Sequence, residues 1–180
     1  KGIGVLYLKS RRTVHNITFG GGQEDGLRSG TVNVAAAVSL AKSLRLSQEK
    51  VEVIKVNHKE YKKLIVDEFS KYKHIVINSP LSENFVDSIV NISLPKIKGE
   101  VIVNALNDRG IMVSTTSACS SKTFHLNEAL YARGLSKENI EGSIRVSFSY
   151  ETTRKEVETF IEVLIDEYNK KFKEVIESGI

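Results

Sequence analysis

Short β-prone runs and longer amphipathic stretches alternate along this chain, and that alternation limits the possible folds more than any other feature of the sequence. Strands need β-branched and apolar residues, and helices need apolar residues spaced three and four apart. The β-prone runs are 74–78, 88–94, 111–114 and 143–148. The stretches with helical spacing are 34–41, 48–72, 99–107, 126–133 and a last one that opens at 152–153. The pattern predicts a layered fold of helices on a sheet, without internal repeats.

The first 31 residues contain short apolar runs followed by a glycine-rich loop. Residues 1–8 and 14–19 are short apolar runs that predict two more strands, and the glycine-rich loop 20–31 leads from them into a helix. This loop places backbone amides, hydroxyls and Arg28 just before the start of a helix. All of these groups attract an anion, so the loop is suited to binding a phosphate group. Because a terminal strand needs a sheet to join, we expect an amino-terminal half to precede Lys1.

Composition and charge exclude several classes of protein. The 180 residues are 41% hydrophobic and 27% charged, as in ordinary globular domains. No apolar run approaches the roughly 18 to 20 residues that span a bilayer, and the first residues lack the pattern of a signal peptide. The formal charge of +4 comes from basic residues mixed with acidic ones. We therefore expect a soluble, cytoplasmic protein that binds neither membranes nor nucleic acid.

Cys119 is the one cysteine of the chain, which excludes an internal disulfide and a multi-cysteine zinc site. It lies in the small, hydroxyl-rich segment 115–121, which predicts a loop after a strand. Such a loop can expose a reactive thiol, whereas structural cysteines usually lie in apolar periodic segments. Both a packed and a reactive thiol stay open. The four histidines show no metal-ligand spacing, so no metal site is predicted.

Arg145 stands inside the apolar run 143–148. A guanidinium in a strand of this kind is costly to bury without a partner, so the position predicts an anion nearby. An internal carboxylate and the carboxylate of a bound substrate both satisfy this requirement. The sequence leaves the two alternatives open, together with an exposed position at a sheet edge.

Four segments, taken in order, resemble the second half of the class V aminotransferase-like cysteine desulfurases: KGIGVLYLK, GGGQEDGLRSGT, GIMVSTTSACSS and SIRVSFSYETT. The cysteine in SACSS is similar to that of the group I enzymes. The resemblance implies an α/β fold, the carboxy-terminal domain of fold-type I pyridoxal-phosphate enzymes. Residues 1–46 would then be the last strands and helix of the large domain, with its phosphate and interface loop. Residues 47–180 would be an α+β small domain that carries the cysteine loop.

The same resemblance implies a reaction. Cys119 would take the sulfur of L-cysteine as a persulfide and leave L-alanine, Arg145 would grip the substrate carboxylate, and Thr31 would reach the phosphate of pyridoxal 5'-phosphate across a homodimer interface. The cofactor lysine of this family is expected before Lys1, so the chain alone is expected to be inactive. Alternatives are a sulfur-accepting or docking module without lyase activity and a selenocysteine lyase-like enzyme.

The expected partners also follow from the resemblance. They are an iron-sulfur scaffold protein or a tRNA-thiolation enzyme as sulfur acceptor. A persulfide on Cys119 would be able to ligate an iron-sulfur cluster transiently during transfer.

Overall fold

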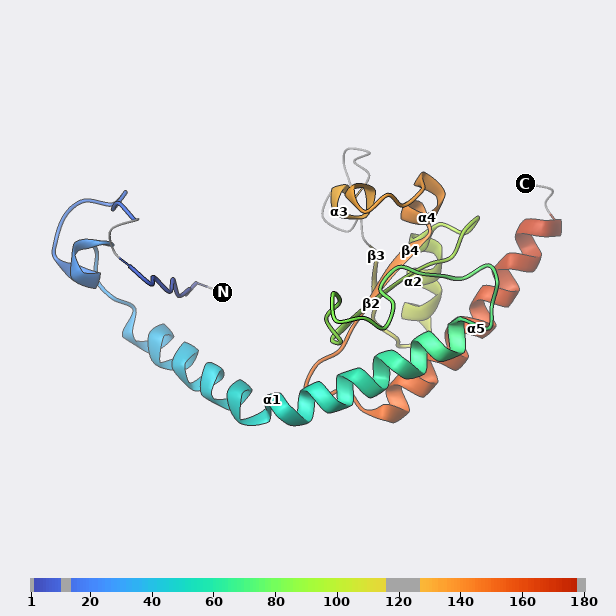
Figure 1. The fold of residues 1–180 in the computed structure, drawn as a ribbon, viewed down its shortest axis with the longest axis horizontal. Coiled ribbons are helices and arrows are strands. Elements are labelled where there is room, and N and C mark those ends of the chain that lie inside the picture. Colours follow the sequence, from blue (N-terminus) through green and yellow to red (C-terminus); the bar gives the residue numbers. More distant parts are fainter. Residues whose placement is uncertain (1, 11–13, 116–126, 178–180) are drawn as a thin grey trace. The chain divides into compact units, whose positions relative to one another are not determined.

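The computed structural model describes residues 2–10, 14–115 and 127–177, and its chain divides into two compact units, residues 1–51 and 52–180. Helix α1 (Val34–Phe69) runs from the first unit into the second (Figure 1). The sequence predicted two separate helices over 34–72, but α1 is continuous because no glycine or proline interrupts it. Among the described residues, no helix is both long and apolar enough to cross a membrane.

The second unit is built on a four-stranded antiparallel sheet in the order β1-β2-β4-β3. Its strands are β1 (Val76–Ile77), β2 (Ile89–Ser93), β3 (Ser114–Thr115) and β4 (Ser143–Ser147). The outer strands are two residues long, so the five-residue pair β2 and β4 carries most of the ladder. Helices and an antiparallel sheet in one unit make the α+β arrangement that was expected for the small domain.

The register of β2 against β4 gives the sheet two different faces. Val90 pairs with Val146 and Ile92 with Ile144, and all four side chains are buried. Because side chains alternate along a strand, Asn91 and its partner Arg145 lie on the other face. One face is therefore apolar and the other polar.

The apolar face is covered by α2 (Gly99–Asp108), α5 (Arg154–Glu177) and the second half of α1. In Figure 1, α5 and the later turns of α1 run alongside each other. Phe69 of α1 and Phe160 of α5 meet edge to face with ring centroids 6.1 Å apart. The helical residues of the core are Tyr61, Ile65, Phe69, Ile102, Leu106, Val157, Phe160, Leu164 and Tyr168. Their burial supplies the main driving force for folding of this unit.

Two short helices, α3 (Glu128–Ala132) and α4 (Lys137–Glu141), connect β3 to β4. Helix α3 lies inside the predicted helix 126–133, of which residue 126 is outside the described residues. Helix α4 was missed, although Ser136 caps it by accepting a hydrogen bond from the Asn139 amide at 3.2 Å. The polar hydroxyl of Ser93 on β2 donates to the Asn139 carbonyl at 2.6 Å, which ties α4 to the sheet.

The first unit contains a short 3-10 helix, η2 (Gln23–Gly26), and the first turns of α1. The strands predicted at 1–8 and 14–19 are wrong for this structure, because the described residues 2–10 and 14–19 form none. A strand requires a hydrogen-bonded neighbour, and the described part of this unit offers none. Ser29 is the one buried side chain among its described residues, whereas Val5, Leu6 and Tyr7 are at least 75% exposed.

Gly142, just before β4, lies close to the backbone of Leu94, just after β2. The Leu94 amide donates to the Gly142 carbonyl at 3.0 Å, and a Cβ on Gly142 would lie 2.5 Å from the Leu94 carbonyl oxygen. The contact is with backbone, which cannot rotate away. We expect Gly142→Ala to lower the free energy of unfolding by about 1–3 kcal/mol, measured by urea denaturation followed by circular dichroism.

Gly22→Ala is the matched control, because its φ is −83° and a Cβ there would meet no atom within 4 Å. Equal urea midpoints for the two variants would contradict the account of the close strand approach.

Candidate active site

Arg145 lies in the middle of β4, between Asn91 of β2 and Ser114 of β3. Its side chain is on the polar face and is exposed. Within the described residues it forms no ion pair, so the internal carboxylate considered from the sequence is not found there. The guanidinium stands on a rigid strand with its five donors available to an anion from outside this part of the chain.

A buried polar network holds the strands beside Arg145. Asn91 donates from its amide nitrogen to the Ile144 carbonyl at 3.1 Å and accepts from Asn78 at 2.6 Å. Asn78 also donates to the Ser93 hydroxyl at 2.7 Å. Each of these three side chains is buried and satisfied, so the network fixes β1, β2 and β4 relative to one another. Sequence reasoning missed it, although Asn91 and Ser93 alternate with Val90 and Ile92 in an otherwise apolar run.

Strand β3 begins the segment that carries Cys119. Ser114 pairs with Arg145 and Thr115 with Ile144, so β3 ends beside Arg145, the candidate residue for binding an anion. Cys119 lies outside the described residues, and the prediction that it is a reactive loop thiol stays a prediction. Three residues lie between Thr115 and Cys119, and the four Cα–Cα steps that join the two span at most about 14 Å.

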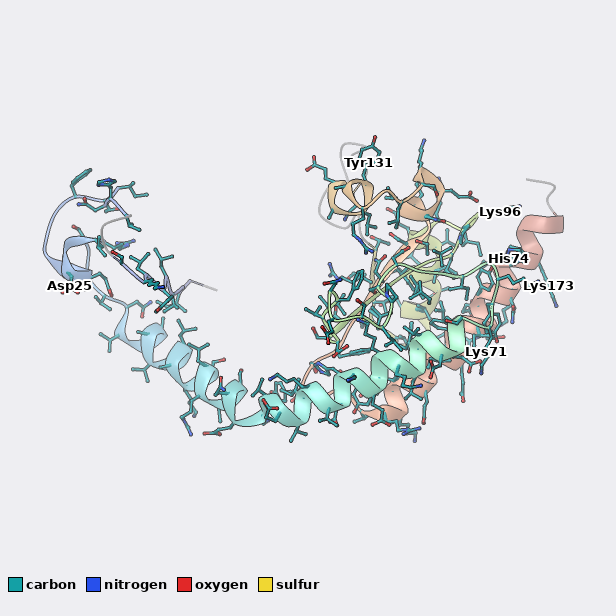
Figure 2. The ribbon with its side chains drawn as sticks, in the orientation of Figure 1. Asp25, Lys71, His74, Lys96, Tyr131 and Lys173 are labelled. Carbon is teal, nitrogen blue, oxygen red and sulfur yellow. The ribbon has the colours of Figure 1, made fainter. Side chains whose placement is uncertain are left out.

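The glycine-rich loop of the first unit closes on itself. The Ser29 hydroxyl donates to the Gly21 carbonyl at 2.8 Å, and the Gly30 amide donates to the Gln23 side chain at 3.2 Å. Glu24 and Asp25 adopt left-handed φ values of 51° and 55°, and Figure 2 labels Asp25 in this turn. Such φ values are uncommon outside glycine and mark a tightly determined loop.

Thr31 carries the hydroxyl of the predicted phosphate site that is not used inside the loop, whereas the Arg28 guanidinium donates to the Ser29 carbonyl at 2.5 Å. Ser29 is used inside the loop, and Asn33 caps α1 by accepting from the Ala36 amide at 3.0 Å. Thr31 is exposed, and its hydroxyl makes no hydrogen bond within the described residues. It lines a hollow of about 880 Å³ between residues 2–8 and the first turns of α1. Thr31 belongs to the first unit and Arg145 to the second.

A cluster around Phe85 was not foreseen from the sequence. Lys62 of α1 is fully buried and donates to the carbonyls of Phe85 and Val86 at 3.4 and 3.0 Å. Its ammonium lies 5.6 Å from the centroid of the Phe85 ring, and the guanidinium carbon of Arg133 lies 4.6 Å from the same centroid. Asp87 completes the surroundings of Lys62, with 3.8 Å between its carboxylate and the ammonium.

Comparison with known proteins shows the family of this chain. The family model described as "Aminotransferase class-V" matches residues 1–160, so the chain belongs to the class V aminotransferase family, as its four motifs indicated. The chain is 37% identical over 187 residues to the NifS/IcsS protein homolog of Lactobacillus delbrueckii subsp. bulgaricus, covering 99% of this chain and 46% of that protein. It is 34% identical to the cysteine desulfurase IscS 1 of Archaeoglobus fulgidus, covering 91% and 43%.

Solved structures show the same architecture. A NifS-like protein matches 86% of this chain and 39% of its own, with a TM-score of 0.72 and 29% identity. The NifS-like protein of Rickettsia africae ESF-5, at 24% identity and a TM-score of 0.67, matches 91% of this chain and 40% of its own and shares the fold. The chain thus spans less than half the length of each of these relatives.

Burial lowers the pKa of Lys62, and Asp87 partly opposes the shift. Between this lowered value and the ordinary 10.5, the unfolded chain binds more protons than the folded one, so the free energy of unfolding rises with pH. We therefore expect wild type to gain stability relative to Lys62→Met as the pH is raised from neutral toward 10.5. Urea denaturation at a series of pH values measures the difference.

Lys63→Met controls for the loss of one lysine charge, because the side chain of Lys63 is 63% exposed. Parallel pH profiles of wild type and Lys62→Met would contradict the burial effect.

Proposed function

We propose that this chain is the carboxy-terminal half of a pyridoxal-phosphate-dependent cysteine desulfurase. Residues 1–46 are assigned to the end of the large, cofactor-binding domain and residues 47–180 to the small domain. The exposed Arg145, without an ion pair in the described residues, on a strand next to the one that leads to Cys119, is the observation that carries the proposal. The names of the relatives support it, since the protein of Archaeoglobus fulgidus is called a cysteine desulfurase.

Arg145 supplies recognition of the substrate in this proposal. Its planar guanidinium can accept the carboxylate of L-cysteine in a two-point contact, which fixes the orientation of the amino acid. The network of Asn78, Asn91 and Ser93 holds the strands that carry this contact, so the guanidinium is presented from a rigid base.

Thr31 fits a role at the cofactor phosphate. Its hydroxyl is exposed, next to a loop whose other hydroxyl, that of Ser29, is already bonded. Pyridoxal phosphate, when bound, acts as the electron sink that makes the carbon-sulfur bond of cysteine labile. The lysine that holds the cofactor is assigned to the other half of the protein, so the chain alone is expected to form no alanine.

Cys119 is proposed as the nucleophile. Its thiolate attacks the substrate sulfur, an S–S bond forms as the carbon-sulfur bond breaks, and the electron pair of the broken bond stays on the carbon. That carbon takes up a proton and becomes the methyl group of L-alanine. One cysteine and one enzyme thiol thus give one alanine and one persulfide, which then passes its sulfur to an iron-sulfur scaffold or a thiolation enzyme. A homodimer in the cytoplasm is the proposed assembly.

Coexpression of the chain with the amino-terminal half tests this function. We expect alanine to form from L-cysteine with both halves present, and Arg145→Lys to raise KM for cysteine about tenfold because the two-point contact is lost. Arg154→Lys is the control, since Arg154 is bound to Glu158 and Glu60 on the surface.

Cys119→Ala is expected to abolish persulfide formation on the enzyme, as detected by mass spectrometry. Absence of alanine from the paired halves would favour a sulfur-accepting or docking module, and higher activity on selenocysteine than on cysteine would favour a selenocysteine lyase.

A further inference from the structure

The side chain of Arg145 has a polar neighbour on each adjoining strand. Paired residues of an antiparallel sheet point their side chains to the same face, with Cβ atoms about 4.5–5.5 Å apart. Arg145 is paired with Asn91 of β2 on one side and with Ser114 of β3 on the other. Among the described strands, β3 lies at the edge of the sheet, next to β4 (Figure 1). The polar face therefore carries an amide, a guanidinium and a hydroxyl in one row across three strands.

Ser114 differs from Asn91 because its side chain is not used within the sheet. The amide group of Asn91 donates to the Ile144 carbonyl at 3.1 Å and accepts from Asn78 at 2.6 Å. The Ser114 side chain is half-buried, and its hydroxyl forms no hydrogen bond within the described residues. This hydroxyl is therefore available to a group that comes from outside this part of the chain.

The two serines of β4 are placed differently. Ser143 and Ser147 lie two residues before and after Arg145 on the same face, about 7 Å away along the strand. Ser143 is buried and donates to a carbonyl of α4 at 2.8 Å. Ser147 is exposed and is paired with the apolar Ile89. Ser114 thus carries the hydroxyl that lies directly opposite Arg145 in the sheet.

A carboxylate has more acceptor positions than one guanidinium fills. Its two oxygens can accept about four hydrogen bonds, and a two-point contact with an arginine uses two of them. We propose that the Ser114 hydroxyl donates a hydrogen bond to the substrate carboxylate held by Arg145, so that the two residues form one carboxylate site. This inference deepens the proposed function and rests on it for the identity of the substrate as an amino acid.

Binding of L-alanine, the expected product, tests this carboxylate site without turnover. The chain paired with its amino-terminal half is titrated with L-alanine by calorimetry. We expect Ser114→Ala to raise the Kd about tenfold or more, because a hydrogen bond to a charged group is lost. The same Kd in Ser114→Ala and wild type would overturn the proposal.

Ser114→Thr and Thr115→Val are the matched variants. Threonine keeps the hydroxyl and suits a strand, so Ser114→Thr should bind L-alanine with nearly the wild-type Kd. Thr115 carries the next hydroxyl of β3, but it is paired with the buried Ile144 and so faces the apolar side of the sheet. Thr115→Val should therefore keep the wild-type Kd. Equal weakening in Ser114→Ala and Thr115→Val, or a threonine variant no better than alanine, would contradict the role of the Ser114 hydroxyl.

Steady-state kinetics on L-cysteine separate this inference from the proposed function. In Ser114→Ala we expect KM to rise about tenfold or more at unchanged kcat, because the carboxylate contact is the same in the ground state and the transition state. Alanine formation with an unchanged KM, or with only a lower kcat, would refute the inference and leave the desulfurase function standing. L-Alanine binding that depends on Ser114, in a protein that forms no alanine from cysteine, would refute the function and leave the carboxylate site standing.

Discussion

The antiparallel pairing of β2 with β4 is the constraint on which the rest of the second unit depends. It buries Val90, Ile92, Ile144 and Val146 on one face and leaves Arg145 on the other. A slip of one residue would place the guanidinium in the core and expose the isoleucines, so the apolar pattern alone determines the register. The candidate substrate contact thus follows from the same alternation that builds the core.

Polar contacts hold the helices and strands of the second unit in one arrangement, which apolar burial alone does not do. The amide network of Asn78 and Asn91 joins β2 to the residue after β1, and the cluster around Phe85 connects α1 with α3 through Lys62 and Arg133. Such contacts add little net stability when fully satisfied, but they are costly to break and therefore hold one arrangement. In this unit they surround the strand that presents Arg145 and the helix that follows the cysteine-bearing segment.

Much of this fold could be predicted from local chemistry. The limits of β2 and β4 follow from alternation, and the end of α2 follows from Gly110, whose φ of +77° suits glycine best. The absence of strands at 2–10 and 14–19 could not be predicted, because strand pairing depends on neighbours remote in sequence. The burial of Lys62 could not be predicted either, because its partners lie 23 to 25 residues further along the chain.

For Arg145, the sequence predicted an anionic partner but not where that partner comes from. Its place in an apolar run indicated an anion as its partner, and two sources of that anion stayed open. The register shows that the side chain is on the exposed face, without an ion pair among the described residues, which favours an external carboxylate. In the proposed function that anion is the carboxylate of L-cysteine, an identity that no pattern of apolar residues contains.

The proposed transfer of sulfur from L-cysteine to Cys119 is tested most directly by a single turnover of the paired halves. The reaction contains L-cysteine but no reductant and no sulfur acceptor. Alanine and the Cys119 persulfide would be quantified in the same sample by mass spectrometry. We expect one persulfide on Cys119 for each alanine formed. Alanine without persulfide on Cys119, or release of the sulfur as free sulfide at the rate of alanine formation, would contradict it.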